Sequence, residues 1–144
     1  MYTISGVFSG IGSTTLPAVS IYSPSGNGFA IREIAVWNET VTACFYNIVR
    51  LSTTGTQGTG LTEVEYAADL RDPTATAFAA HSVAPTLGNV IRRMPIGAAV
   101  GAGYYYTWGG KGLIVPSGTG NGVGIILATG TGQLCSYHID WEEE

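Results

Sequence analysis

Apolar and polar residues alternate along most of this 144-residue chain, in short segments separated by clusters of glycine, proline, asparagine and serine. A period of two is typical of a β-strand with one buried face, whereas an amphipathic helix repeats every 3.6 residues. No segment of the sequence combines a sustained helical period with capping residues at both ends. The pattern predicts ten strands, at residues 2–9, 18–23, 28–37, 43–51, 76–81, 88–94, 103–108, 111–115, 122–129 and 133–141.

The last predicted strand has the clearest alternation. One face carries Cys135, Tyr137, Ile139 and Trp141, and the other carries Leu134, Ser136, His138 and Asp140. We expect the first set in the core and the second towards solvent or a neighbour. The strand at 28–37 differs, because apolar side chains fall on both faces: Phe29, Ile31, Ala35 and Trp37 on one, and Ala30, Ile34 and Val36 on the other. Such a strand needs cover on both sides, from another element or another subunit.

Eight to ten short strands without a helix predict an all-β fold, an antiparallel β-sandwich of the jelly-roll type. The length fits a single domain spanning residues 1–144. Two glycine-rich segments are expected to be loops. Residues 53–60 form the more flexible of the two, and residues 97–103 are small and apolar enough either to pack in an interface or to be a floppy loop.

Charged residues are scarce, at 11% of the chain, and the formal net charge is −4. A compact monomer of this mass exposes on the order of 7,000 Å², so 16 charges cover it thinly. Together with a mean hydropathy of +0.24, this predicts that copies of the chain or a partner cover much of the surface.

The negative charge argues against nucleic acid as a partner, and no apolar stretch is long enough to cross a membrane. The first residues lack the pattern of a secretory signal, so we expect a product made in the cytoplasm.

Ser136, His138 and Asp140 look like a catalytic triad written along one strand face. However, residues i and i+2 of a strand lie roughly 6.7 Å apart and project in parallel, which is too far for a nucleophile and its base. The two histidines and the scattered carboxylates show no metal-ligand spacing, and no complete phosphate loop is present. We therefore expect no catalytic residue, metal or cofactor.

Cys44 and Cys135 are interpreted as two small buried hydrophobic residues, with a disulfide across the sheets as the alternative.

The run from Tyr104 to Trp108 concentrates aromatic side chains, and alternation turns Tyr105 away from the others. Such residues pack in cores, anchor protein interfaces or, as a third choice, bind sugar together with a polar neighbour such as Asn121. Arg92 and Arg93 form the only dibasic step. They are either solvated or paired with carboxylates of a partner.

Residues 105–122, followed by 124–126 and 138–143, resemble small virion proteins of tailed bacteriophages, and in particular the capsid decoration (cement) proteins. The resemblance covers roughly residues 30–50 and 104–143. It rests on glycine-rich, charge-poor β-structure rather than on a diagnostic motif. It implies a jelly roll or similar sandwich that forms a homotrimer and binds the major capsid protein at threefold or quasi-threefold positions on the capsid exterior.

On this basis we expect a non-enzymatic structural protein of the virion. Its interface with other subunits is expected to include Tyr2, Ile4 and Phe8 of the N-terminal segment together with Arg92, Arg93 and Tyr105. Two alternatives remain open: a tail-fibre, head-fibre or receptor-binding module of a phage, and a saccharide-binding β-sandwich.

Overall fold

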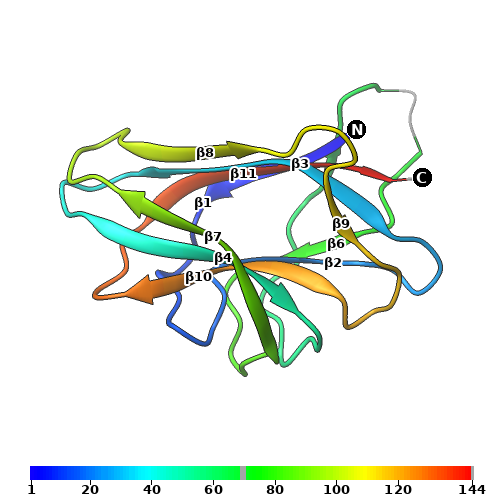
Figure 1. Cartoon of the computed structure of the whole chain (residues 1–144), viewed down its shortest axis with the longest axis horizontal. Coiled ribbons are helices and arrows are strands. Elements are labelled where there is room, and N and C mark those ends of the chain that lie inside the picture. Colours follow the sequence, from blue (N-terminus) through cyan, green and yellow to red (C-terminus); the bar gives the residue numbers. More distant parts are fainter. Residues whose placement is uncertain (69–70, 144) are drawn as a thin grey trace.

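Two antiparallel sheets pack face to face in the computed structural model, which describes residues 1–68 and 71–143 (Figure 1). These residues contain eleven strands and no helix: β1 (Tyr2–Val7), β2 (Val19–Tyr22), β3 (Phe29–Asn38), β4 (Cys44–Leu51), β5 (Val64–Glu65), β6 (Thr76–Phe78), β7 (Leu87–Ile96), β8 (Gly103–Thr107), β9 (Leu113–Val115), β10 (Gly122–Thr129) and β11 (Cys135–Glu143). Accordingly, no helix in the described part of the chain is long and apolar enough to span a membrane. All ten predicted strands are found, and the two-residue β5 was not anticipated.

The strand order is that of a jelly roll. Sheet A runs β5-β1-β11-β3-β8, with β9 also pairing with β3, and sheet B runs β6-β2-β10-β4-β7. If the short strands β5, β6 and β9 are set aside, the chain crosses from one sheet to the other at every connection except β4 to β7. The first and last long strands, β1 and β11, pair side by side in the middle of sheet A. This nesting of two Greek keys confirms the predicted antiparallel sandwich.

The core lies between the sheets and is built from the inward positions of each strand. Ile4, Ile34 and Ile139 of sheet A and Ile21, Ile48 and Ile125 of sheet B are at most 1% exposed. Burial of each such side chain stabilises the folded state by about 1.5–3 kcal/mol relative to leaving the side chain exposed. The inward set predicted for the last strand is also confirmed, because Cys135, Tyr137, Ile139 and Trp141 are all buried.

A β-bulge in β3 corrects the predicted faces of this strand. Asp140 lies opposite Glu33 and Trp141 lies opposite Ile31, so Arg32 has no partner on β11. The extra residue shifts the alternation by one. Phe29, Ile31, Ile34 and Val36 therefore all join the core, and the strand does not require cover on both sides. Three apolar positions remain outside the core: Ala30, Ala35 and Trp37. Trp37 lies on the outer face, where the centre of its ring is 5.2 Å from the centre of the His138 ring.

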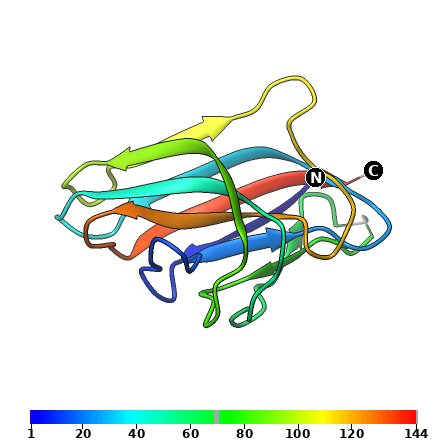
Figure 2. The same ribbon diagram turned by 60° about the horizontal axis from the view of Figure 1, so that its bottom comes forward.

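Two loops cover part of the outer face of sheet B. A second apolar cluster lies there, formed by Tyr22, Val49, Leu51 and Ile126 with Phe78 and Leu87 packed against it. The segment 53–60, expected to be a flexible tip, is instead tied to residues 82–86: the Thr56 amide donates to the Val83 carbonyl at 3.1 Å, and the Ser82 amide donates to the Thr56 carbonyl at 3.0 Å. In Figure 2 these loops lie at the bottom of the view, on the outer side of sheet B. The edge strands of the two sheets, β7 and β8, are neighbours at one side of the sandwich.

The two cysteines face each other across the core. Cys44 on β4 and Cys135 on β11 are both buried free thiols, and their sulfur atoms are 3.8 Å apart. They occupy the positions of two small buried hydrophobic residues, which is the first interpretation given above, and they do not form the alternative disulfide.

Candidate functional site

Polar side chains form a cluster on the outer face of sheet A, away from the core. His138 and Asp140 point outward because they alternate with the buried Ile139 and Trp141. Glu33 reaches the same face because of the bulge at Arg32, which places it directly opposite Asp140 in the ladder. We call Glu33, His138 and Asp140 the carboxylate–histidine cluster.

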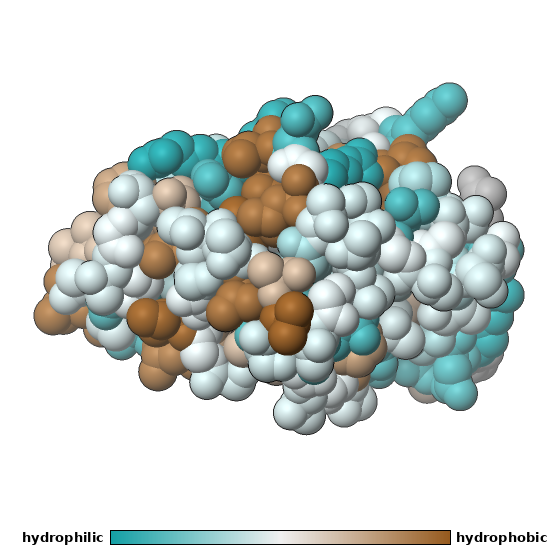
Figure 3. Space-filling view, turned by 90° about the horizontal axis from the view of Figure 1, so that it is seen from below, coloured by the Kyte–Doolittle hydropathy of each residue, from teal (hydrophilic) through white to brown (hydrophobic). Residues whose placement is uncertain are grey.

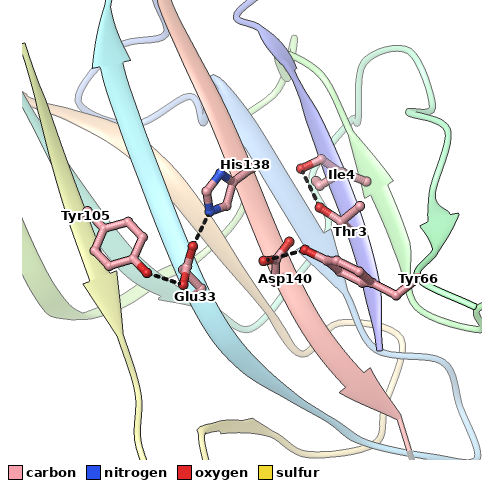
Figure 4. A network of polar contacts seen from close by, with 7 residues as sticks. All are labelled: Thr3, Ile4, Glu33, Tyr66, Tyr105, His138 and Asp140. Atoms are coloured by element: carbon pink, nitrogen blue, oxygen red, sulfur yellow. Dashed lines mark hydrogen bonds and ion pairs between the residues drawn. The ribbon is translucent and has the colours of Figure 1, made fainter. Parts of the chain in front are cut away.

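The three side chains of the cluster lie close together, and two tyrosines flank them (Figure 4). His138 Nε2 is 2.6 Å from Glu33 Oε1. The hydroxyl of Tyr105, on β8, donates to Glu33 Oε2 at 2.7 Å. From the other side, beyond β1, the Tyr66 hydroxyl donates to Asp140 Oδ2 at 3.0 Å. One donor atom each from Glu33, His138 and Asp140 fall within 4.8 Å of one another.

The flanking tyrosines remain protonated hydrogen-bond donors. The pKa of Tyr105 is raised chiefly because its hydroxyl donates to the Glu33 carboxylate. The pKa of Tyr66 is raised by desolvation and then by its hydrogen bond to Asp140. Asp140 itself is 8% exposed, and its Oδ1 is buried without a hydrogen-bond partner among the described residues.

The row Ser136, His138 and Asp140 does not form a triad. The Ser136 hydroxyl is bound to the carboxylate of Glu39, whereas His138 contacts Glu33. The nucleophile and base of a serine hydrolase must contact each other directly, so these residues lack that arrangement. The sequence pattern does not connect Glu33, the residue that completes the cluster, with His138, because the two lie 105 positions apart. Its only signal was an isolated Arg32–Glu33 pair inside an apolar strand.

The residues expected at an interface do not come together. The side chains of Tyr2, Ile4 and Phe8 are only 1–3% exposed, so they belong to the core of the single chain. This corrects their assignment: β1 is an interior strand between β5 and β11, and its inward side chains offer no surface to a neighbour.

The other three expected interface residues lie on different parts of the surface. The Arg92 guanidinium lies 4.3 Å from the centre of the Tyr106 ring and is half-buried at the edge between the sheets. Arg93 is exposed above Phe45 of sheet B, at 5.2 Å from the ring centre. Tyr105 is 57% exposed on sheet A. Only Arg93 and Tyr105 present substantial free surface, and they belong to different sheets.

Most of the aromatic side chains in the run 104–108 are packed against other residues. Tyr104 and Trp108 pack against the core, and Tyr106 lies between Trp108 and Arg92. The amide of Asn121 donates to the carbonyl of Ser117 within its own turn. Tyr105 is therefore the one aromatic side chain of this run with a largely exposed ring, and Asn121 does not lie beside it in a common hydrogen-bond network.

A second surface feature is the apolar end, which we define as the loops 8–18, 39–43, 97–102 and 130–134. These loops join β1–β2, β3–β4, β7–β8 and β10–β11 and meet at one end of the sandwich, opposite the chain termini (Figure 1). Their 27 residues include one charged side chain, Glu39. The exposed side chains include Ile11 (39%), Val41 (74%), Val100 (64%) and Leu134 (43%).

Buried polar side chains hold the loops of the apolar end in place. The Asn38 side-chain amide donates to the carbonyls of Thr42 and Gly97, at 2.7 and 2.9 Å. The Asn38 backbone pairs with the loop at 97–102 in both directions, through Gly101 and Ala102. The Tyr46 hydroxyl contacts carbonyl oxygens of two further loops, those of Ile11 at 2.9 Å and Gln133 at 2.8 Å. Because the Glu39 amide also donates to the Leu134 carbonyl at 3.2 Å, all four loops are linked into one preformed surface.

A groove of about 680 Å³ lies at the other end of the molecule, beside β9 and the last residues of β11. Its charged side chains include Arg32, Lys111 and Glu142. Arg32 donates to Glu142 through two nitrogen atoms, at 3.0 and 2.5 Å, so the opposite charges of these two side chains largely neutralise each other.

No known protein family, curated protein or solved structure matches this chain.

Proposed function

We propose that this chain is a non-enzymatic structural protein of a tailed-phage virion, which binds the capsid exterior as a homotrimeric decoration protein. The observation that carries the proposal is the apolar end. It is a preformed surface with one charge among 27 residues, at which isoleucine, valine and leucine side chains are exposed. A surface that is poor in charge and exposes several aliphatic side chains is typical of protein–protein contacts, whose centres are depleted of charge.

We assign the apolar end to contact between copies of the chain. In Figure 3, which views the molecule from the side of sheet B, apolar residues gather at the left end and across the centre, while the right half is mostly neutral in hydropathy. Because Asn38 and Tyr46 already order the loops, association would cost little further conformational entropy. Burying one valine side chain contributes about 1.5–3 kcal/mol, and a closed trimer repeats each contact three times.

The jelly-roll fold and the scarcity of charge support the capsid part of the proposal. A decoration protein requires many weak contacts that act together, rather than a reactive centre. A trimer presents three copies of each contact to the capsid, so modest individual affinities give strong binding. Arg93 and Tyr105, the expected interface residues with free surface, remain available for contacts with the major capsid protein.

The first test is the mass in solution, measured by light scattering during size-exclusion chromatography at micromolar concentration. We expect three times the 15.0 kDa mass of the chain. Val41→Asp combined with Val100→Asp should shift the protein to monomer, because it places charge in the apolar end. Val83→Asp is the matched control, since Val83 is 55% exposed but lies outside that surface. A wild-type monomer, or equal effects of the variant and the control, would contradict the trimer.

The second test is co-sedimentation of the protein with phage capsids that lack decoration protein. We expect the wild type to pellet with the capsids and the monomeric variant to bind at least tenfold more weakly, because it loses avidity. A trimer that never binds any tailed-phage capsid would contradict the decoration role and favour a fibre or receptor-binding component instead.

A further inference from the structure

The carboxylate–histidine cluster has the features of a metal site, and the proposed function does not use it. We propose that Glu33, His138 and Asp140 bind a divalent first-row transition cation of the Zn²⁺ type. This inference is independent of the proposed role in a virion.

The donor atoms are already gathered. One atom from each of the three residues lies within 4.8 Å of the others, and His138 Nε2 and Glu33 Oε1 are 2.6 Å apart. Ligands of a tetrahedral zinc site are roughly 3.4 Å from one another, given metal–ligand distances of about 2.0–2.1 Å. Small rotations of the side chains would therefore bring all three donors to a common centre, and the backbone ladder between β3 and β11 would remain intact.

The buried Oδ1 atom of Asp140 is an independent observation that points to a ligand. Asp140 is 8% exposed, and among the described residues nothing donates a hydrogen bond to this oxygen. Buried polar atoms are almost always satisfied by a hydrogen-bond donor, an ordered water or an ion. A cation at the cluster would supply the missing partner, and it would also offset the two carboxylates that face each other across the β3–β11 ladder.

The tyrosines flanking the cluster orient the carboxylates in the way that outer-shell partners of metal sites do. Tyr105 binds Oε2 of Glu33, which leaves Oε1 on the side of His138. Tyr66 binds Oδ2 of Asp140, which leaves Oδ1 free. On the other side of His138, the Trp37 ring at 5.2 Å restricts the imidazole. Each ligand thus has a second contact that fixes its direction.

The donor set selects the class of metal. One imidazole nitrogen with two carboxylate oxygens suits zinc, cobalt or nickel better than calcium or magnesium, which prefer oxygen ligands alone. The side chains of His138 and Glu33 are 23% and 19% exposed. Solvent can therefore reach the cluster, and water would complete the coordination of the metal.

The test is calorimetric titration of chelator-treated protein with Zn²⁺, together with thermal unfolding in the presence of the metal. We expect one Zn²⁺ per chain and a melting temperature that rises with Zn²⁺ concentration. Asp140→Asn keeps the shape of the side chain and an acceptor for Tyr66, and it should weaken binding at least tenfold. Glu39→Gln is the matched control: it removes a carboxylate that binds Ser136 on the same strand and should leave affinity unchanged.

Two measurements distinguish this site from other zinc ligands and do not depend on the folding of a variant. Cobalt bound at the cluster should show no thiolate charge-transfer absorption, whereas binding at Cys44 and Cys135 would produce it. Because the chain has two histidines, imidazole NMR signals can also be followed in the wild type. Zn²⁺ should perturb His138 and leave His81 unchanged. Absence of binding, a thiolate band, an unperturbed His138, or equal losses in Asp140→Asn and Glu39→Gln would each overturn the proposal.

Discussion

Glu143 at the end of β11 provides a sharp test of how the long β4–β7 connection is held. Its carboxylate accepts hydrogen bonds from the amides of Thr74 and Ala75, from the Thr74 hydroxyl and from the Trp141 indole, at 2.6–3.1 Å. Burial alone would raise the pKa of Glu143. The hydrogen bonds from Thr74, Ala75 and Trp141 outweigh it and hold the pKa below its ordinary value of 4.5.

Glu143→Gln removes the charge and replaces one accepting oxygen with a donor that faces Thr74. Hydrogen bonds to a charged group contribute about 1.5–3 kcal/mol each, and one oxygen of the glutamine still accepts. Because Glu143 is only partly buried, we take the lower end of this range and expect a loss of about 2 kcal/mol at neutral pH. For a chain of this length that corresponds to a fall in melting temperature of roughly 5–8 °C.

The direction of the pH dependence follows from the lowered pKa of Glu143. The stabilisation is fully present above about 4.5, the pKa of an unfolded glutamate, and is lost as the pH falls through the lower pKa of the folded state. The difference between wild type and Glu143→Gln should therefore be largest at neutral pH and disappear in acid.

The assay is urea unfolding followed by tryptophan fluorescence at several pH values between 3 and 7. Glu142→Gln is the control, because the neighbouring carboxylate makes a partly exposed ion pair with Arg32, and ion pairs at the surface contribute about 0–1 kcal/mol. The reasoning is refuted if Glu143→Gln is no more destabilising than the control at pH 7, or if its effect persists unchanged at pH 3.

Two further predictions concern buried groups. Burial raises the pKa of both Cys44 and Cys135, so neither thiol should react with a thiol reagent in the native state, and their labelling should follow global unfolding; rapid labelling of native protein would contradict this. Burial lowers the pKa of His81, whose Nε2 is 2.7 Å from the Ser20 hydroxyl. The unfolded state therefore binds a proton first, and stability should fall as the pH drops from about 6.5 towards the lower folded-state pKa. In urea titrations His81→Gln should show a shallower loss over that pH range, and an unchanged slope would count against this role of His81.

The architecture could be predicted from the sequence because alternation is a local property. The period of two in the last strand separated its inward and outward side chains correctly, and the turn residues located ten of the strands. The bulge at Arg32 could not be predicted in this way. It depends on which residues of β11 lie opposite β3, and this register is set by pairing between segments more than 100 positions apart.

The candidate sites were harder to predict because they depend on which elements become neighbours. Tyr2 and Ile4 already alternated with Thr3 and Ser5, which is the pattern of a half-buried strand. The expectation of an interface there relied instead on their position near a chain end, and the pairing of β1 with β11 buries them. The apolar end had a visible signal in the small apolar segment 97–103. Its meaning depended on the three other loops, which the jelly-roll topology brings to the same place.

The two proposals can fail separately because they concern different parts of the molecule. The apolar end is formed by loops that Asn38 and Tyr46 organise, whereas the carboxylate–histidine cluster lies on the outer face of sheet A between Tyr105 and Tyr66. No residue belongs to both surfaces. A monomeric protein that still binds one Zn²⁺ would therefore remove the trimer and leave the metal site standing. A trimer with no affinity for Zn²⁺ would do the reverse, since valine contacts between loops require no donor from Glu33, His138 or Asp140.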